Sequence, residues 1–174
     1  MSSEHREHPL YQGKLWIRGP LTITAETLAD LDEHARAEYP SECCGFVFGP
    51  ADEPGHLDAS VREVNEADKY HALDPETFPR TSRTYFKINE LRATRAIERA
   101  EAEGRPMKVV YHSHCDVGAY FSDEDCATFS QGGQLMWPCA FIVVSVHEDG
   151  VRDHKVWVHV PGTDAFEEAE LRVV

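Results

Sequence analysis

The strongest constraint on the fold lies near the C-terminus, where two long apolar runs flank a tight turn. Residues 140–146 and 151–160 are rich in Val and other strand-forming residues, and Glu148-Asp149-Gly150 separates them. A short turn that contains Gly between two such runs is typical of a β-hairpin. The chain is therefore expected to contain an antiparallel pair of strands, and so a sheet against which helices pack.

Helical patterns precede this hairpin. Thr24 offers an N-cap for a helix over 25–37, in which apolar residues recur at helical spacing. An apolar stripe predicts a second, longer helix over 89–103, and Gly104 stands where a helix C-cap belongs. A short third helix is expected to begin at Ser122.

Short strand patterns alternate with these helices. Strands are expected, in chain order, at 14–17, 43–48, 61–64, 85–88 and 107–111. Residues 66–84 are polar, contain prolines and are interpreted as a long surface loop, a kind of segment that often carries function. The predicted fold class is α/β with an α+β character: a mixed sheet with helices packed on it. Residues 1–12 are expected to form a disordered tail.

The composition excludes several classes of partner. The chain has 174 residues, enough for one domain, and a formal net charge of −14. Nucleic-acid binding requires clustered Lys and Arg, so no nucleic-acid partner is expected. No apolar run approaches the ~20 residues of a membrane span, and no secretory signal is visible, so no membrane partner is expected. The five cysteines follow no structural zinc spacing, and their odd number favours reduced thiols and a cytoplasmic location.

Residues of metal-binding types follow the predicted strand at 107–111. His112 and His114 are two residues apart, and because side chains alternate along a strand, both imidazoles are expected on the same face. Ser122 and Asp125 are three residues apart, which puts them on one face of a helical first turn. Two His and one carboxylate leave a tetrahedral zinc ion with one open position, as in catalytic sites. His112, His114 and Asp125 are therefore predicted to hold one zinc ion per chain.

Hydrolysis at such a site needs a group that accepts a proton. Glu42 directly precedes the predicted strand at 43–48 and is the leading candidate for the general base. Ser122 is predicted to donate a hydrogen bond to the developing oxyanion. Both residues also have a purely structural interpretation. Ser122 and Asp125 fit a helix capping box, and a Glu at the start of a strand is usually a solvated carboxylate.

The joint pattern resembles the JAMM motif of the MPN+ metalloproteases. That motif consists of a Glu, then His-x-His, seven residues, a Ser, two residues and an Asp. Its positions are filled here by Glu42, His112, His114, Ser122 and Asp125. The order of helices and strands resembles the family over roughly residues 13–160. The resemblance implies the cytidine-deaminase-like MPN/JAMM fold, in one domain over 13–174, of the small bacterial single-domain type.

The resemblance also implies a function. Members of the family are zinc-dependent peptidases or isopeptidases, and small bacterial members are linked to cleavage after the C-terminal Gly-Gly of ubiquitin-like sulfur carriers. A ubiquitin-like or sulfur-carrier protein is therefore the expected substrate and partner. Arg80 and Arg83, within the loop over 66–84, are hypothesised to meet an acidic surface of that partner. Family members are often dimers, so a homodimer is compatible with the resemblance, although no pattern here indicates a dimer face.

Two other functions are alternatives to the peptidase. A catalytically inactive scaffold of the same fold usually lacks a His, the Asp or the Glu, and none is missing here. A zinc nucleobase deaminase needs His-x-Glu and Pro-Cys-x-x-Cys, and Ile142 stands where the second Cys would be, so that function is rejected. One residue departs from the family: Cys115 follows His114 where Pro is usual. This puts in doubt the geometry of the following loop and raises the thiol as a competing ligand.

Overall fold

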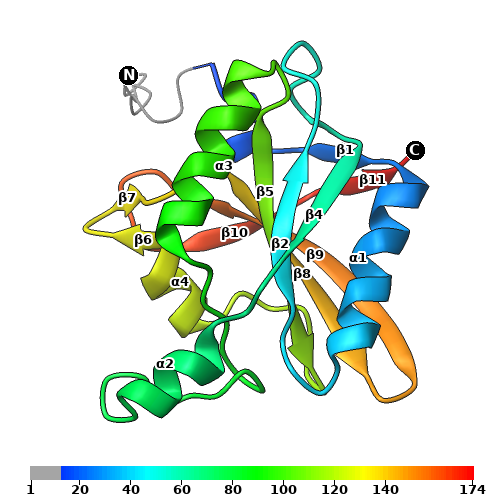
Figure 1. Ribbon diagram of the computed structural model, residues 1–174. Helices are drawn as coiled ribbons and strands as arrows, with labels where there is room; N and C mark the ends of the chain where they lie inside the picture. Colours follow the sequence, from blue (N-terminus) through cyan, green and yellow to red (C-terminus); the bar gives the residue numbers. More distant parts are fainter. Residues whose placement is uncertain (1–12) are drawn as a thin grey trace.

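The fold is that of a computed structural model, in which residues 13–174 are described (Figure 1). The tail expected over residues 1–12 lies outside the described residues. Within the described part, no helix is long and apolar enough to cross a bilayer.

A six-stranded mixed sheet forms the centre of the structure. Its strands, in spatial order, are β10 (Phe166–Ala169), β9 (Gly150–His159), β8 (Ala140–His147), β5 (Met107–Cys115), β2 (Cys44–Phe48) and β4 (Ala59–Glu63). β5 and β8 are parallel, and the other neighbouring pairs are antiparallel. The expected mixed sheet is confirmed, and the expected hairpin is β8–β9, which turns at Gly150 with a φ of 128°.

The two long helices cover opposite faces of this sheet (Figure 1). Helix α1 (Ala25–Glu38) lies on the face to which Tyr111 of β5 points, because the Tyr111 hydroxyl is 2.7 Å from Nδ1 of His34 in α1. Helix α3 (Glu90–Ala102) lies on the other face, where Ala96 and Phe46 line one groove. Since side chains alternate along β5, His112 belongs to the face of α3.

Short elements complete the fold. Helix α2 (Ala67–Leu73) and helix α4 (Asp123–Phe129) lie near one end of the sheet (Figure 1). A small parallel sheet has the order β11 (Leu171–Val173), β1 (Leu21–Ile23) and β3 (His56–Leu57), and a short hairpin joins β6 (Ser130–Gln131) to β7 (Gln134–Leu135). The expected helices at 25–37, at 89–103 and from Ser122 correspond to α1, α3 and α4.

The strand expected at 14–17 is wrong. Residues Leu15–Ile17 form a 3₁₀ turn, in which the Ile17 amide donates to the Lys14 carbonyl. Trp16 and Ile17 are both buried although they are adjacent. The apolar character of this segment therefore reflects a turn that is buried in the core.

The loop expected over 66–84 and the strand expected at 85–88 are also corrected. Helix α2 lies inside that loop, and residues 85–88 form no strand. Phe86 and Ile88 are buried in alternation, as a strand would require. However, the Lys87 amide donates to the Asn65 side chain and its carbonyl accepts from the Glu66 amide, so contacts with the residues before α2 replace a strand ladder.

Candidate metal centre

The two histidines project from the middle of the sheet. β5 is longer than expected and runs through Cys115, and His112 is paired with Cys44 on one side and Val143 on the other. His112 is fully buried and His114 nearly so. Their Nε2 atoms are 3.1 Å apart, so the predicted convergence of the two imidazoles is observed.

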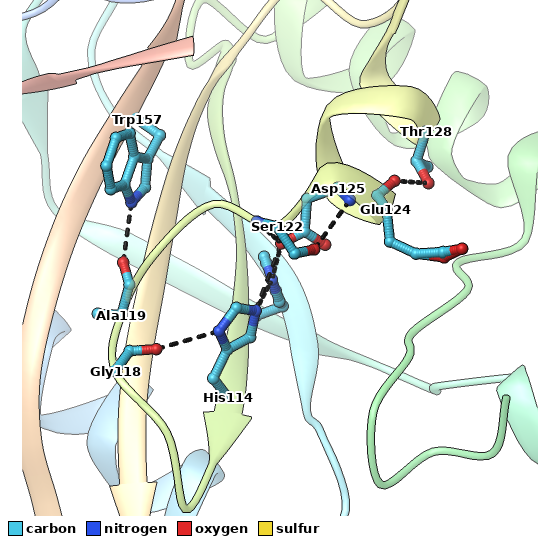
Figure 2. Close-up of polar contacts among 9 residues, drawn as sticks. His114, Gly118, Ala119, Ser122, Glu124, Asp125, Thr128 and Trp157 are labelled. Carbon is cyan, nitrogen blue, oxygen red and sulfur yellow. Dashed lines mark hydrogen bonds and ion pairs between the residues drawn. The ribbon is translucent and has the colours of Figure 1, made fainter. Parts of the chain in front are cut away.

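Helix α4 brings Asp125 to the same point. The Ser122 hydroxyl accepts from the Asp125 amide at 3.0 Å, and Asp125 Oδ2 accepts from the Ser122 amide at 3.1 Å, which forms a capping box. Oδ2 of Asp125 also lies 3.1 Å from Nε2 of His112 and 3.3 Å from Nε2 of His114. Figure 2 shows Asp125 and Ser122 at the start of the helix, facing His114.

These three atoms fit the geometry of a zinc site. Ligands of a tetrahedral zinc ion, at ~2.0–2.1 Å from it, lie about 3.3 Å from one another. The three separations here are between 3.1 and 3.3 Å. The donor set is also suitable, because imidazole nitrogen and carboxylate oxygen are common zinc ligands.

Neighbouring groups orient both imidazoles. Nδ1 of His114 is 3.1 Å from the Gly118 carbonyl, which selects the tautomer that leaves Nε2 free as a ligand (Figure 2). Nδ1 of His112 has no hydrogen-bond partner among residues 13–174. Its ring is instead stacked on Phe86, with centroids 4.3 Å apart, so packing sets its orientation.

The charges of the ligands suit a cation. Burial lowers the pKa of His112, which favours the neutral form that binds metal. Burial alone would raise the pKa of Asp125, but the adjacent imidazoles of His112 and His114 hold it well below its ordinary value. The site therefore presents a carboxylate and neutral imidazole together.

Glu42 lies beside this group without being part of its closest contacts. Ligand atoms of Glu42, His112 and His114 lie within 4.8 Å of one another. Burial raises the pKa of Glu42 to about 9, the negative charge of Asp125 adds to the rise, and Arg80 opposes it. A cation on the imidazoles would bring that pKa down, because it favours the carboxylate. The separation leaves room for a water molecule between Glu42 and a metal ion.

Both backbone polar groups of Glu42 are held by the segment that follows β4. The Glu42 amide donates to the Ser82 carbonyl at 2.7 Å, and the Glu42 carbonyl accepts from Asn65 Nδ2 at 2.9 Å. The Asn65 side chain also donates to the Tyr85 carbonyl and accepts from the amides of Ala67 and Lys87. Sequence reasoning missed Asn65 and Ser82. An Asn side chain that accepts from the amide two residues on is a recognisable local motif, but its bond to Glu42 leaves no local pattern.

A narrow cleft of about 140 Å³ opens over the group. Its wall includes Ser122, whose hydroxyl acts as a cap and faces the cleft as well, so the structural and the catalytic interpretation are both compatible with its position. Arg80, Arg83 and Cys115 also line the cleft. The structure thus brings together all five residues of the predicted site, while their roles stay predictions.

Comparison with known proteins identifies the family. Residues 24–159 match the sequence model of the prokaryotic homologs of the JAB domain. The chain belongs to this family. Its membership confirms the resemblance to JAMM/MPN proteins, because JAB, JAMM and MPN are names for one domain type.

Individual proteins similar to this JAB-family chain share at most about a third of their residues with it in the comparisons below. The CysO-cysteine peptidases of Mycobacterium tuberculosis and Mycobacterium bovis are 31% identical over 119 residues, which cover 67% of this chain and 68% of theirs. A solution structure from Desulfitobacterium hafniense covers 89% of this chain and 93% of its own, with a TM-score of 0.66 and 19% identity. One from Salinibacter ruber covers 88% and 92%, with a TM-score of 0.58 and 24% identity. The two structures show a shared fold alone.

Proposed function

We propose that this JAB-family protein is a zinc-dependent peptidase. The observation that carries the proposal is the group formed by Nε2 of His112, Nε2 of His114 and Oδ2 of Asp125, whose mutual separations of 3.1–3.3 Å match a zinc coordination shell. The mycobacterial relatives, which are peptidases by name, support the same reaction class.

The other residues at the cleft supply the groups that hydrolysis needs. A zinc ion held by the three ligands would act as a Lewis acid on the carbonyl and on water. Glu42 takes a proton from the attacking water and passes it to the leaving amine as the C–N bond breaks. The Ser122 hydroxyl, which accepts from the Asp125 amide, keeps its own proton to donate to the developing oxyanion.

The substrate we propose is the C-terminal tail of a ubiquitin-like or sulfur-carrier protein, cut after Gly-Gly. The name of the mycobacterial relatives indicates that they act on a bond between CysO and cysteine. The cleft beside the histidines is narrow, at about 140 Å³. A pair of glycines brings no side chain to be accommodated there, so such a tail fits where a bulkier one would collide.

The first experiment is metal analysis combined with a cleavage assay. The purified protein is expected to contain one zinc ion per chain and to cleave a host sulfur-carrier protein extended beyond Gly-Gly. A chelator should abolish cleavage, and added zinc should restore it. A protein without stoichiometric zinc, or cleavage that is indifferent to the chelator, would overturn the zinc peptidase and favour an inactive scaffold.

A Glu42→Gln variant tests the general base. Gln is nearly isosteric but accepts no proton, so we expect zinc binding to persist while kcat falls by about 10²–10⁴-fold. Glu98→Gln on the exposed side of α3 is the matched control and should cleave like the wild type. If Glu42→Gln holds zinc and retains full activity, another group is the base.

A further inference from the structure

Two arginines flank the mouth of the cleft above the candidate metal centre. Arg80 and Arg83 line it together with Glu42, His114 and Cys115. The chain has a net charge of −14, and these two cations are the groups at this small opening that would attract an anion.

The turn that carries both arginines is firmly anchored. Ser82, between them, is buried, and its amide and hydroxyl donate to the two carboxylate oxygens of Asp68 at 2.7 and 2.8 Å. Its carbonyl accepts from the Glu42 amide at 2.7 Å. The stems of Arg80 and Arg83 therefore start from a fixed position relative to the proposed base, which lowers the entropic cost of binding a ligand.

The two guanidinium groups differ in how far they are neutralised. Nε of Arg80 lies 3.7 Å from Oε2 of Glu124. The guanidinium of Arg83 makes no ion pair or hydrogen bond with any of residues 13–174. Burial raises the pKa of Cys115 to about 12, and the charge of Arg83 opposes that rise, as expected of a guanidinium near the wall of the cleft that Cys115 forms.

We infer that Arg83, assisted by Arg80, binds the terminal α-carboxylate of a single residue that the enzyme removes from its carrier substrate. The inference rests on the proposed function and narrows it. The planar guanidinium suits bidentate recognition of a carboxylate. The cleft is small, at about 140 Å³, and a lysine side chain in an isopeptide bond would bring no carboxylate to it.

The reaction balances with water alone. Water adds across the peptide bond, the terminal glycine of the carrier becomes a free acid, and the leaving amino group gains the proton. The carboxylate of the released residue stays ionised throughout, so its interaction with Arg83 is present in substrate and product alike.

The test compares three substrates that differ only beyond Gly-Gly. A sulfur-carrier protein ending in Gly-Gly-Ala is prepared with a free carboxylate, with an amidated C-terminus, and with several further residues. Alanine replaces cysteine so that no thiol competes for zinc. The zinc-loaded enzyme is expected to cleave the free acid about ten- to a hundredfold more efficiently, by kcat/KM, than the other two.

Variants assign this preference to the arginine. Arg83→Gln should raise KM for the free acid, leave the amidated substrate unchanged and keep the zinc content. Arg83→Lys should retain part of the preference, and Arg95→Gln, on the exposed side of α3 in a different groove, should retain all of it. Equal cleavage of all three substrates by the wild type would overturn the inference and leave the peptidase intact. Cleavage of none would overturn the proposed function itself.

Discussion

Cys115 is the residue at which this chain departs from its family, and the structure shows what replaces the usual proline. β5 continues through Cys115, which pairs with Val146. The chain then turns at Asp116, whose φ of 65° is uncommon for a residue other than Gly. The carboxylate of Asp116 accepts from the Tyr39 hydroxyl at 2.8 and 3.0 Å. A side-chain hydrogen bond thus supports the loop that follows Cys115 in this chain.

The structure also argues against Cys115 as a metal ligand. Cys115 lines the cleft, but among the described residues the ligand atoms that lie within 4.8 Å of one another belong to Glu42, His112 and His114, and the Cys115 thiol is not in this group. We therefore expect Cys115→Ser to keep its zinc and its cleavage rate, as measured by metal content and kcat/KM. A loss of zinc comparable to that in His114→Ala would contradict this.

The candidate site was predictable from the sequence because its spacing is local. His112 and His114 follow from the two-residue period of a strand, and Ser122 with Asp125 follows from one helical turn. Glu42 was singled out because it directly precedes a buried strand, and the family resemblance points to the same residue. Asn65 and Ser82 escaped prediction because their bonds to Glu42 span long stretches of chain.

At the scale of elements, Asn65 joins three segments that would otherwise be independent. Its side chain is bonded to the backbone at Glu42, at Ala67 and at the stretch from Tyr85 to Lys87. All four of these contacts involve backbone groups that have no ladder partner at that point. The Asn65 side chain therefore satisfies backbone donors and acceptors that a further strand would otherwise have paired.

Asn65→Asp tests this role with a minimal change of shape. The substitution replaces the Nδ2 donor by an oxygen that faces the carbonyls of Glu42 and Tyr85. We expect a loss of about 1–3 kcal/mol in the free energy of unfolding, measured by denaturant titration. Because the base shifts while the ligands do not, kcat should fall with zinc content unchanged. Unaltered stability and turnover would show that Asn65 is dispensable.

Elements with their own start and stop signals were predicted, and those held by distant partners were not. α1 and α3 are capped by Thr24 and Asn89, whose side chains accept from amides of the first turn. The small parallel sheet has no comparable start or stop signal in the sequence. β1 and β11 have three residues each and lie at opposite ends of the chain, too short for any periodicity.

At the scale of the whole molecule, a buried histidine couples stability to pH. Burial, together with the nearby charge of Arg62, lowers the pKa of His34 from 6.5 to about 4. The Nδ1 of His34 contacts the Tyr111 hydroxyl, which joins α1 to the central strand. Because the unfolded chain binds this proton more readily, stability is complete above pH 6.5 and is lost as the pH falls towards 4.

A His34→Gln variant isolates this contribution. Gln has no such titration, so the wild type should lose stability relative to the variant between pH 6.5 and 4, by on the order of 2 kcal/mol once solvent screening is allowed for. Denaturant unfolding of both proteins with a chelator present provides the measurement and removes any effect of metal release. Parallel pH profiles for the two proteins would rule out His34 as the source.

The two hydrogen bonds to the Glu42 backbone connect the proposed base to the proposed substrate-binding arginines. One anchored segment supplies the Ser82 and Asn65 contacts that position the base, and it carries Arg80 and Arg83 at the mouth of the cleft. A change in that segment's path would therefore displace both functions at once. A variant designed for a different substrate tail would therefore have to change residues around the two arginines and keep Asn65 and Ser82. Replacing the whole segment would remove the hydrogen bonds that position Glu42.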